Sequence, residues 1–245
     1  MRYSGFVGLT PEAALEQGKL YCAFQPIVDL ARGDIFGYES LARSEAEEFP
    51  NPGALFKAAI ETGFTGRLGR ALRQISVRDC PNTTLFLNMH PDEFSEGWLI
   101  RPDDPLSMHD CDVFLEITES VPLSHYRYCH SVLAEIRSRG VKIVVDDLGA
   151  GYSNLRYIAD LQPDVVKLDR DLVAGLVHDS PLHRLVTSLV LLCQQMGARV
   201  VAEGIETSTE LHAVIDTGAH FGQGFYLARP ARIPPTIDWP SLLRR

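Results

Sequence analysis

Short apolar runs alternate with longer amphipathic stretches along this chain of 245 residues. Several of the runs are continuously apolar, which is typical of strands covered on both faces, as in parallel sheets. We therefore predict eight strands, at residues 20–30, 35–43, 83–89, 113–119, 142–147, 164–169, 199–205 and 221–228.

The stretches between these runs carry signals for the starts and ends of helices. In three of them a Thr, Asn or Ser precedes a Pro, and a Gly closes the stretch. We predict helices over residues 10–18, 51–63 and 180–197, the third with a broad apolar stripe on one face. The alternation of strands and helices indicates βαβ units.

Seven or eight such units in one chain favour a closed (β/α)8 barrel over two open sheets, and a barrel of this kind needs about 250 residues. The first two runs are separated by a short turn at Arg32-Gly33, which predicts a hairpin and hence an antiparallel pair. The expected fold class is therefore α/β. It is a modified TIM barrel with one antiparallel strand, formed as a single domain by residues 1–245.

Polar residues stand at the ends of nearly all the predicted strands. In a barrel, the carboxyl ends of the parallel strands open on one face, and that face carries the active site. Taken singly, each acid is more simply explained as a helix N-cap or a loop salt bridge. Their joint occurrence favours one shared site. The residues concerned are Glu39, Asn88, Glu116, Asp146, Asp147, Lys167, Asp169, Glu203 and Gln223.

Five of these residues are carboxylates that repel one another unless protons or cations neutralise them. Two divalent ions would supply four positive charges. Oxygen ligands with one amide and no sulfur suit Mg²⁺ or Mn²⁺ better than a structural zinc ion. Adjacent strand residues point to opposite faces, so Asp146 and Asp147 can share a site only if the strand ends or bends there, and we expect the following residues 148–151 to supply the bend. By the same alternation Glu119 faces away from Glu116, and we expect it to anchor a neighbouring loop.

Composition narrows the remaining possibilities. The formal net charge of −9 disfavours duplex nucleic acid as a partner, because surfaces that follow phosphates are basic. Five widely spaced cysteines without a CxxC pair do not suggest a disulfide framework or a thiolate zinc site. The longest apolar run, residues 185–193, is too short to cross a bilayer, and no signal-peptide pattern follows Met1. We expect a cytoplasmic protein.

Seven motifs occur in an order that resembles the EAL domain family. They are FQPIVDLARGDIFGYESLAR, LNMHP, LEITES, VVDDLGAGYSNL, VVKLDRDLV, VVAEGIET and GQGFYLARP. The resemblance extends from about residue 8 to residue 232, which is nearly the whole chain. The resemblance implies a modified TIM barrel with one antiparallel strand. It also implies metal-dependent hydrolysis of cyclic di-GMP to linear pGpG.

The resemblance further implies roles for individual residues. Lys167, Glu203 and Glu39 would be catalytic, Lys167 by holding the attacking water and Gln223 by positioning solvent. Glu119, Asp169 and Glu206 would support the site, Glu119 by anchoring the loop that begins at Asp147. One metal would be held by Glu39, Asn88, Glu116 and Asp146, and a second by Asp146, Asp147 and Glu203. Phosphate or guanine would be met by Gln25, Arg43, Phe225 and Pro230.

The expected cofactors are two Mg²⁺ or Mn²⁺ ions per active site. Ca²⁺ is expected to inhibit, because its looser coordination would misplace the water. EAL proteins are often dimers that meet through the DDLGAGYSNL loop and the next helix, so we expect a homodimer. We also expect a sensor domain, either fused to this domain or on a partner protein.

The chain departs from the family pattern at a few positions. Ser40 is the middle residue of the triplet Glu39-Ser40-Leu41, which corresponds to the Glu-Ala-Leu that names the family. Leu148 and Ala150 replace the more usual Phe and Thr. These two changes affect the position of their loop and hence the expected rate of hydrolysis. Strand alternation turns Ser40 away from Glu39, so we expect its hydroxyl to need a hydrogen-bond partner in the packing. Two alternatives stay open. One is a receptor that holds cyclic di-GMP without cutting it, and the other is a hydrolase of a different phosphodiester.

Overall fold

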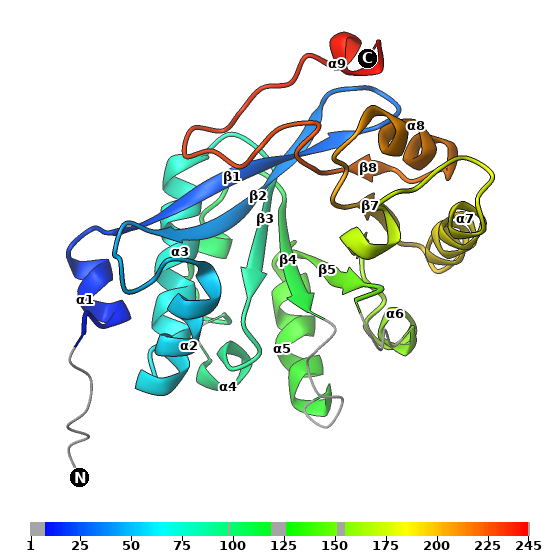
Figure 1. Ribbon diagram of the computed structural model, residues 1–245. Coiled ribbons are helices and arrows are strands. Elements are labelled where there is room, and N and C mark those ends of the chain that lie inside the picture. The colour runs from blue at the N-terminus through cyan, green and yellow to red at the C-terminus, as the bar shows by residue number, and fades with distance from the viewer. Residues whose placement is uncertain (1–7, 98, 119–125, 151–154, 245) are drawn as a thin grey trace.

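Eight strands close into a barrel in the computed structural model, with the helices packed around it (Figure 1). The structure describes residues 8–97, 99–118, 126–150 and 155–244. The strands are β1 Leu20–Asp29, β2 Ile35–Ser44, β3 Leu85–Met89, β4 Val113–Thr118, β5 Lys142–Leu148, β6 Val165–Leu168, β7 Arg199–Ala202 and β8 Phe221–Gly222. Each strand pairs with its sequence neighbours, and β1 with β8 closes the ring.

β1 is antiparallel to both of its neighbours, whereas the pairs from β2 to β8 are parallel. The predicted hairpin at Arg32-Gly33 is the cause. Asp29 accepts hydrogen bonds from the backbone of Ala31 and Arg32, and the chain turns back at once into β2. The expected modified TIM barrel with one antiparallel strand is therefore confirmed.

The three helices predicted from their end signals are present with the predicted caps. The side chains of Thr10, Asn51 and Ser180 each accept a backbone hydrogen bond at the start of a helix. The described helices are α1 Pro11–Glu16, α2 Pro52–Thr62, α3 Thr65–Asp79, α4 Glu93–Glu96, α5 Tyr126–Ser138, α6 Arg156–Leu161, α7 Pro181–Gln195, α8 Ser208–Asp216 and α9 Trp239–Leu243, with short 3₁₀ helices η1 Pro105–Ser107 and η3 Arg170–Leu172. Within the described part of the chain, every helix is too short or too polar to span a membrane.

The last two strands end earlier than predicted. β7 stops at Ala202 rather than residue 205, and β8 stops at Gly222 rather than residue 228. Gly204 has a φ of 72°, which turns the chain, and a side chain at Gly224 would collide with the backbone of Ile205. The apolar residues beyond these glycines therefore form loops at the mouth of the barrel instead of further ladder.

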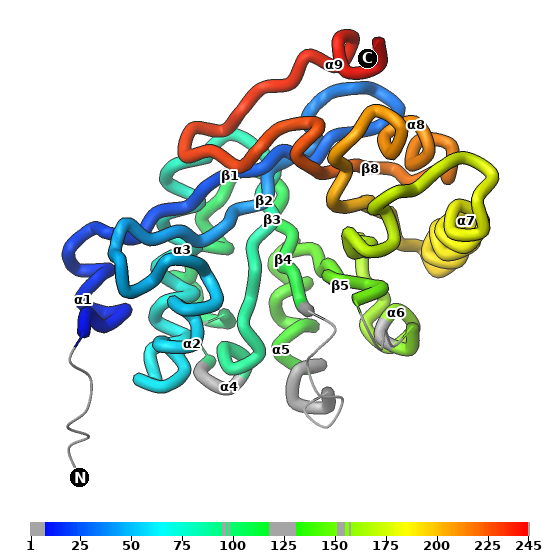
Figure 2. Tube along the Cα trace, viewed as in Figure 1, coloured from blue at the N-terminus to red at the C-terminus, as the bar shows by residue number. Residues whose placement is uncertain are grey.

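The C-terminal segment runs along β1, as the red part of the chain shows in Figure 2. Phe24 and Ala231 exchange two backbone hydrogen bonds, of 2.7 and 3.1 Å. Tyr38 donates to the carbonyl of Pro235 at 2.9 Å. Because β8 is only two residues long, this segment covers backbone of β1 that a longer β8 would have paired.

One end of the barrel interior is filled by hydrophobic side chains. Phe86 and Phe114 stack with ring centroids 4.4 Å apart, and Phe36 stacks on Phe221 at 4.3 Å. The guanidinium of Arg199 lies within 6 Å of the rings of Phe36, Phe114 and Phe221. This apolar floor leaves the opposite end of the interior to the polar residues of the strand ends.

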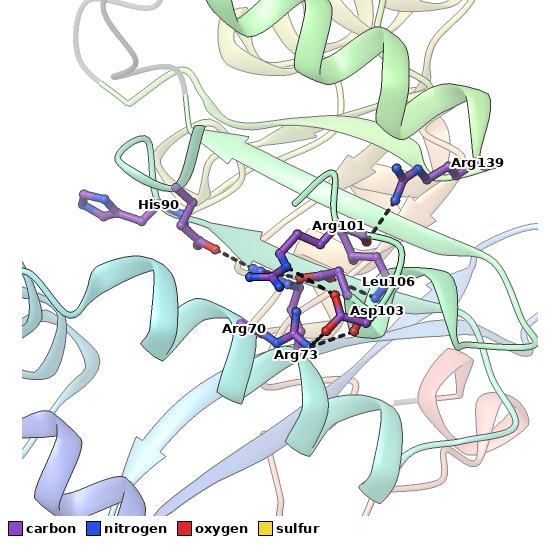
Figure 3. Close-up of polar contacts among 9 residues, drawn as sticks. Arg70, Arg73, His90, Arg101, Asp103, Leu106 and Arg139 are labelled. Atoms are coloured by element: carbon purple, nitrogen blue, oxygen red, sulfur yellow. Dashed lines mark hydrogen bonds and ion pairs between the residues drawn. The ribbon is translucent and has the colours of Figure 1, made fainter. Parts of the chain in front are cut away.

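A buried arginine fixes the loop that follows β3. Arg73 of α3 is 2% exposed and forms ion pairs with Glu93 at 2.6 Å and with Asp104 at 3.1 Å, both fully buried. Glu93 also accepts from the backbone of His90, two residues beyond Asn88. Figure 3 shows the surroundings of Arg73, where Arg70 contacts Asp103 and Arg139 donates to the carbonyl of Arg101. Arg73 thus ties the end of β3 to the helix layer.

Replacing Arg73 with Met should lower the free energy of unfolding by about 3–5 kcal/mol, because two buried carboxylates lose their cation. Chemical denaturation followed by circular dichroism measures this. Arg78→Met is the matched control, since Arg78 lies on the same helix but its pair with Asp79 is exposed. The control should cost at most about 1 kcal/mol. Equal losses in the two variants would contradict the role given to Arg73.

Candidate active site

The polar residues predicted at the strand ends converge at the mouth of the barrel. Glu39 comes from β2, Glu116 from β4 and Lys167 from β6. Asp146 and Asp147 lie near the end of β5, and Glu203 directly follows β7. Their approach follows from the shared direction of β2 to β7, because the carboxyl ends of parallel strands open on one face.

Lys167 lies at the centre of this group. Its Nζ is 2.8 Å from Glu116, 2.8 Å from Glu203, 3.1 Å from Asp146 and 3.5 Å from Glu39. The side chain is 1% exposed. Burial disfavours its charge, but the surrounding carboxylates more than offset this and hold the pKa of Lys167 well above its usual value. One ammonium group therefore faces four carboxylates, which leaves an excess of negative charge.

Side-chain amides orient Glu39. Its Oε1 accepts from Asn88 at 3.1 Å, and its Oε2 accepts from Gln223 at 2.6 Å. The same Gln223 amide donates to Gln25 at 3.2 Å, and Gln25 donates to the carbonyl of Ala228. Burial alone would raise the pKa of Glu39, but the charge of Lys167 and these hydrogen bonds lower it below its usual value. Glu39 is therefore held as a carboxylate.

Asp146 and Asp147 reach the same site because the backbone turns at Asp147. Asp147 has a φ of 58°, a left-handed conformation that is uncommon for a residue other than glycine. The register between β5 and β6 shifts between Val145 and Leu148. Ligand atoms of Asp146, Asp147 and Glu203 consequently lie within 4.8 Å of one another. The bend that the sequence required is present, and its centre is Asp147 itself.

The carboxylate group is poorly satisfied without a further cation. Burial and neighbouring acids raise the pKa of Glu116 well above its usual value, that of Glu203 to about 8 and that of Asp147 to about 6. Oε2 of Glu116 is buried without a hydrogen bond among the described atoms, while Oε1 of Glu116 and Oδ1 of Asp146 share the ammonium group of Lys167. Oxygens of this kind, with one amide beside them, fit Mg²⁺ or Mn²⁺.

A cleft of about 220 Å³ opens beside this group. The cleft is lined by polar residues of the strand ends, by a few apolar residues and by the cation Arg170. The lining residues are Gln25, Glu39, Leu41, Arg170, Glu203, Gly204, Glu206, Gln223, Gly224 and Phe225. The ring of Phe225 is 45% exposed, and the guanidinium of Arg229 lies 4.4 Å from its centroid. The cleft thus offers an aromatic face and a cation next to the carboxylates.

Two basic residues of this region were missed from the sequence. Arg170 lines the cleft and pairs with Glu206 at 3.1 Å, and Arg229 stacks on Phe225. Arg170 directly follows Asp169, and Arg229 directly precedes Pro230, two residues to which the quoted motifs had assigned roles. A search for cations at the strand ends, to complement the acids, would have found Arg170.

Four predicted residues lie in other positions or outside the description. The guanidinium of Arg43 donates to the carbonyl of Ala42, and neither Arg43 nor Pro230 is among the described residues that line the cleft. Asp169 accepts from the backbone of Asp171 and caps η3. Glu119 lies outside the described residues.

Ser40 has the hydrogen-bond partner that its position requires. Its Oγ lies 2.6 Å from Oγ of Ser76 on α3, and both side chains are buried. Ser76 also donates to the carbonyl of Leu72 at 2.8 Å. Ser40 therefore belongs to the packing between β2 and α3, on the opposite side of the strand from Gln223 and Asn88.

The model of the EAL domain family matches residues 11–230, which is most of the chain. The chain belongs to the EAL domain family. This EAL domain is 33% identical over 245 aligned residues to a protein named cyclic di-GMP phosphodiesterase PA2567 of Pseudomonas aeruginosa, with 94% of this chain covered. The match covers 41% of that relative, so the chain spans about two fifths of its length.

Solved structures of EAL proteins share the fold. The MucR phosphodiesterase in complex with c-di-GMP has a TM-score of 0.78 and 28% identity, with 90% of this chain and 95% of that chain covered. BlrP1 of Klebsiella pneumoniae with manganese and cy-diGMP has a TM-score of 0.73 and 28% identity, covering 94% of this chain and 63% of that one. A second BlrP1 structure contains calcium and cy-diGMP.

The affinity of this EAL domain for Mg²⁺ should rise with pH between about 6 and 8. Glu203 and Asp147, with pKa values of about 8 and about 6, hold protons at the low end of this range, and a cation must displace them. The gain is at most about tenfold per pH unit for each proton released. Calorimetry in buffers of different ionisation enthalpy measures both the affinity and the proton release.

Glu203→Gln serves as the comparison, because it removes one titrating ligand and keeps its shape. The variant should bind Mg²⁺ more weakly and with a shallower pH dependence. If the Mg²⁺ affinity of the wild-type protein did not depend on pH, this would contradict the prediction that Glu203 and Asp147 release protons when the ion binds.

Ser40→Ala should lower the free energy of unfolding by about 0.5–1.5 kcal/mol, the net contribution of one hydrogen bond. Ser76 keeps its bond to Leu72, so no buried donor is left unsatisfied. The affinity for Mn²⁺ should be unchanged. A tenfold change in that affinity would show that the serine acts on the carboxylates.

Proposed function

We propose that this EAL domain hydrolyses cyclic di-GMP to linear pGpG in a reaction that depends on two Mg²⁺ or Mn²⁺ ions, as part of bacterial second-messenger signalling. The observation that carries the proposal is the group of five carboxylates around Lys167 at the barrel mouth. All of the predicted metal ligands lie on the strand ends that form this mouth, and none is replaced in the sequence.

The substrate is proposed from relatives and from the cleft. PA2567 is named as a cyclic di-GMP phosphodiesterase, and MucR and BlrP1 have structures with the dinucleotide bound. In this chain the exposed ring of Phe225 offers a face for a purine, and Gln25 offers amide hydrogen-bonding groups. Arg170, on the same cleft, would balance phosphate charge.

Two groups of ligands would hold the metal ions. We assign Glu39, Asn88, Glu116 and Asp146 to one ion, and Asp146, Asp147 and Glu203 to the other. Asp146 is then shared. When bound, a pair of divalent cations lowers the pKa of a water molecule and stabilises the oxygens around the phosphorus atom.

The chain's own groups contribute position and charge. The raised pKa keeps Lys167 protonated, so its ammonium can donate to the attacking water and offset negative charge that develops at the phosphate. Gln223 holds Glu39 in one orientation through its 2.6 Å hydrogen bond. Phe225 and Gln25 would fix the guanine and thereby align the phosphodiester with the water.

Chromatography of the products formed from cyclic di-GMP tests the proposal. Purified protein with Mn²⁺ or Mg²⁺ should release pGpG, and addition of Ca²⁺ should inhibit. Glu39→Gln should lower the rate more than about 100-fold, since loss of a metal ligand exceeds the 10- to 100-fold cost of altering the groups that support one. Glu45→Gln is the control, because Glu45 follows β2 directly but is exposed and paired with Arg232. Absence of turnover with either metal would refute the hydrolase.

One observation supports the alternative function, which is a receptor that binds cyclic di-GMP without cleaving it. Leu148, which replaces the usual Phe, is buried at the end of β5 directly after Asp147, so the loop position bears on the carboxylates. Tight binding of cyclic di-GMP without turnover would favour this second function. Cleavage of other phosphodiesters but not of cyclic di-GMP would favour a different substrate.

We also propose that the protein acts in the cytoplasm as a homodimer, under the control of a fused or partner sensor domain. These proposals rest on the resemblance to EAL proteins. Part of the loop expected at the dimer interface, residues 151–154, lies outside the described residues.

A further inference from the structure

A second group of metal-binding side chains lies away from the barrel mouth. His178 precedes α7, His183 is in the first turn of α7, and Asp216 is the last residue of α8. Ligand atoms of the three side chains lie within 4.8 Å of one another. Figure 1 shows α7 and α8 on the outer side of the barrel beside β7. Residues of the barrel-mouth site take no part in this group.

Two imidazoles converge on one carboxylate oxygen. His178 Nδ1 is 2.7 Å and His183 Nε2 is 3.3 Å from Oδ2 of Asp216. The two rings are 5.2 Å apart and inclined by 56°, so their nitrogens approach the carboxylate from different directions. The two imidazoles and the carboxylate therefore surround one point, which two stacked imidazole rings would not do.

The Nε2 atom of His183 is buried in this group, and its contact with Asp216 at 3.3 Å is not an aligned hydrogen bond. The residue is 6% exposed, and no other described atom forms a hydrogen bond with this nitrogen. A buried polar atom in this state costs free energy unless a partner is supplied. The N-cap bond from His183 N to Ser180 Oγ, at 3.0 Å, fixes the turn that carries the ring. The nitrogen is therefore held toward Asp216 and accepts a further partner.

A second carboxylate lies near His178 on the other side of its ring. Oδ2 of Asp179 is 3.7 Å from Nε2 of His178, while Nδ1 faces Asp216. Imidazoles that bind metals are commonly held by a carboxylate near the remaining nitrogen. Asp179 has a φ of 60°, a left-handed conformation that it shares with Asp147 of the barrel mouth. Such backbone is uncommon and concentrates at functional sites.

His212 lies on a small surface cavity beside this group. It lines that cavity with His178 and Asp216 and precedes Asp216 by four residues on α8. Its Nδ1 is 2.7 Å from the carbonyl oxygen of Ser208, which can only accept, so Nδ1 carries the proton. Nε2 is then left with a lone pair.

We propose that His178, His183 and Asp216 bind a transition-metal dication, with Zn²⁺ as the test ion. Neutral imidazole nitrogens with one carboxylate suit Zn²⁺, Ni²⁺ or Co²⁺, whereas Mg²⁺ and Ca²⁺ prefer oxygen ligands. Water completes the coordination. The ion joins the segment between β6 and α7, which contains the cleft residue Arg170, to the end of α8. This assignment is independent of the proposed hydrolysis.

Titration of the whole chain with Zn²⁺ in excess Mg²⁺ tests the site. Excess Mg²⁺ competes for the carboxylates of the barrel mouth, and variants of the proposed site distinguish any Zn²⁺ that still binds at the mouth. Calorimetry should show one Zn²⁺ per chain, and Co²⁺ should give visible absorption bands of a nitrogen-ligated ion. Zn²⁺ should also raise the melting temperature and shift the side-chain ¹⁵N resonances of His178 and His183.

His178→Ala and Asp216→Asn should each weaken Zn²⁺ binding at least tenfold. His178 is 64% exposed, so its removal leaves the fold in place, which far-ultraviolet circular dichroism verifies. His109→Ala is the control, because His109 binds the carbonyl of Thr83 outside the group and its loss should not alter Zn²⁺ affinity. Absence of Zn²⁺ binding in excess Mg²⁺ overturns the proposal, as does equal binding by the wild type and both variants.

Discussion

The ammonium group of Lys167 facing four buried carboxylates is the interaction on which the mouth of this barrel depends. One positive charge cannot balance Glu39, Glu116, Asp146 and Glu203 together. The imbalance is visible in the raised pKa values of Glu116 and Glu203. A site with this excess of negative charge favours the binding of further cations, and the proposed metal ions would neutralise it.

The rest of the fold serves to hold these charges together. The left-handed backbone at Asp147 turns a second carboxylate into the group. The short β8 leaves Gln223 just beyond the last ladder residue, where its amide reaches Glu39. Behind β3, the buried Arg73 secures the loop that follows Asn88. Each of these features places a polar group where simple packing would have placed an apolar one.

The strand pattern and the hairpin turn predicted the barrel and its antiparallel strand, because burial on both faces leaves a clear hydrophobic signal. The strand ends were less accurate. Apolar residues recur at Ile205 and at residues 225–228, which extended the predicted strands. Close packing of Gly224 on Ile205 turns the backbone away from the ladder, and a one-dimensional pattern does not record such contacts. The acids of the site could be predicted from their places at strand ends. The ion pairs of Lys167, the stacking of Arg229 on Phe225 and the buried Arg73 depend on partners far away in the sequence.

Two residues with left-handed backbone, Asp147 and Asp179, each lie beside a group of side chains for which we propose metal binding. The donors differ, with oxygens at the mouth and imidazole nitrogens at α7 and α8, so the two groups are expected to select different ions. Anomalous diffraction from crystals grown with Mn²⁺ tests the central claim about the mouth most directly. The account predicts two manganese peaks, both within bonding distance of the Asp146 carboxylate. A single peak, or none at these carboxylates, would contradict it.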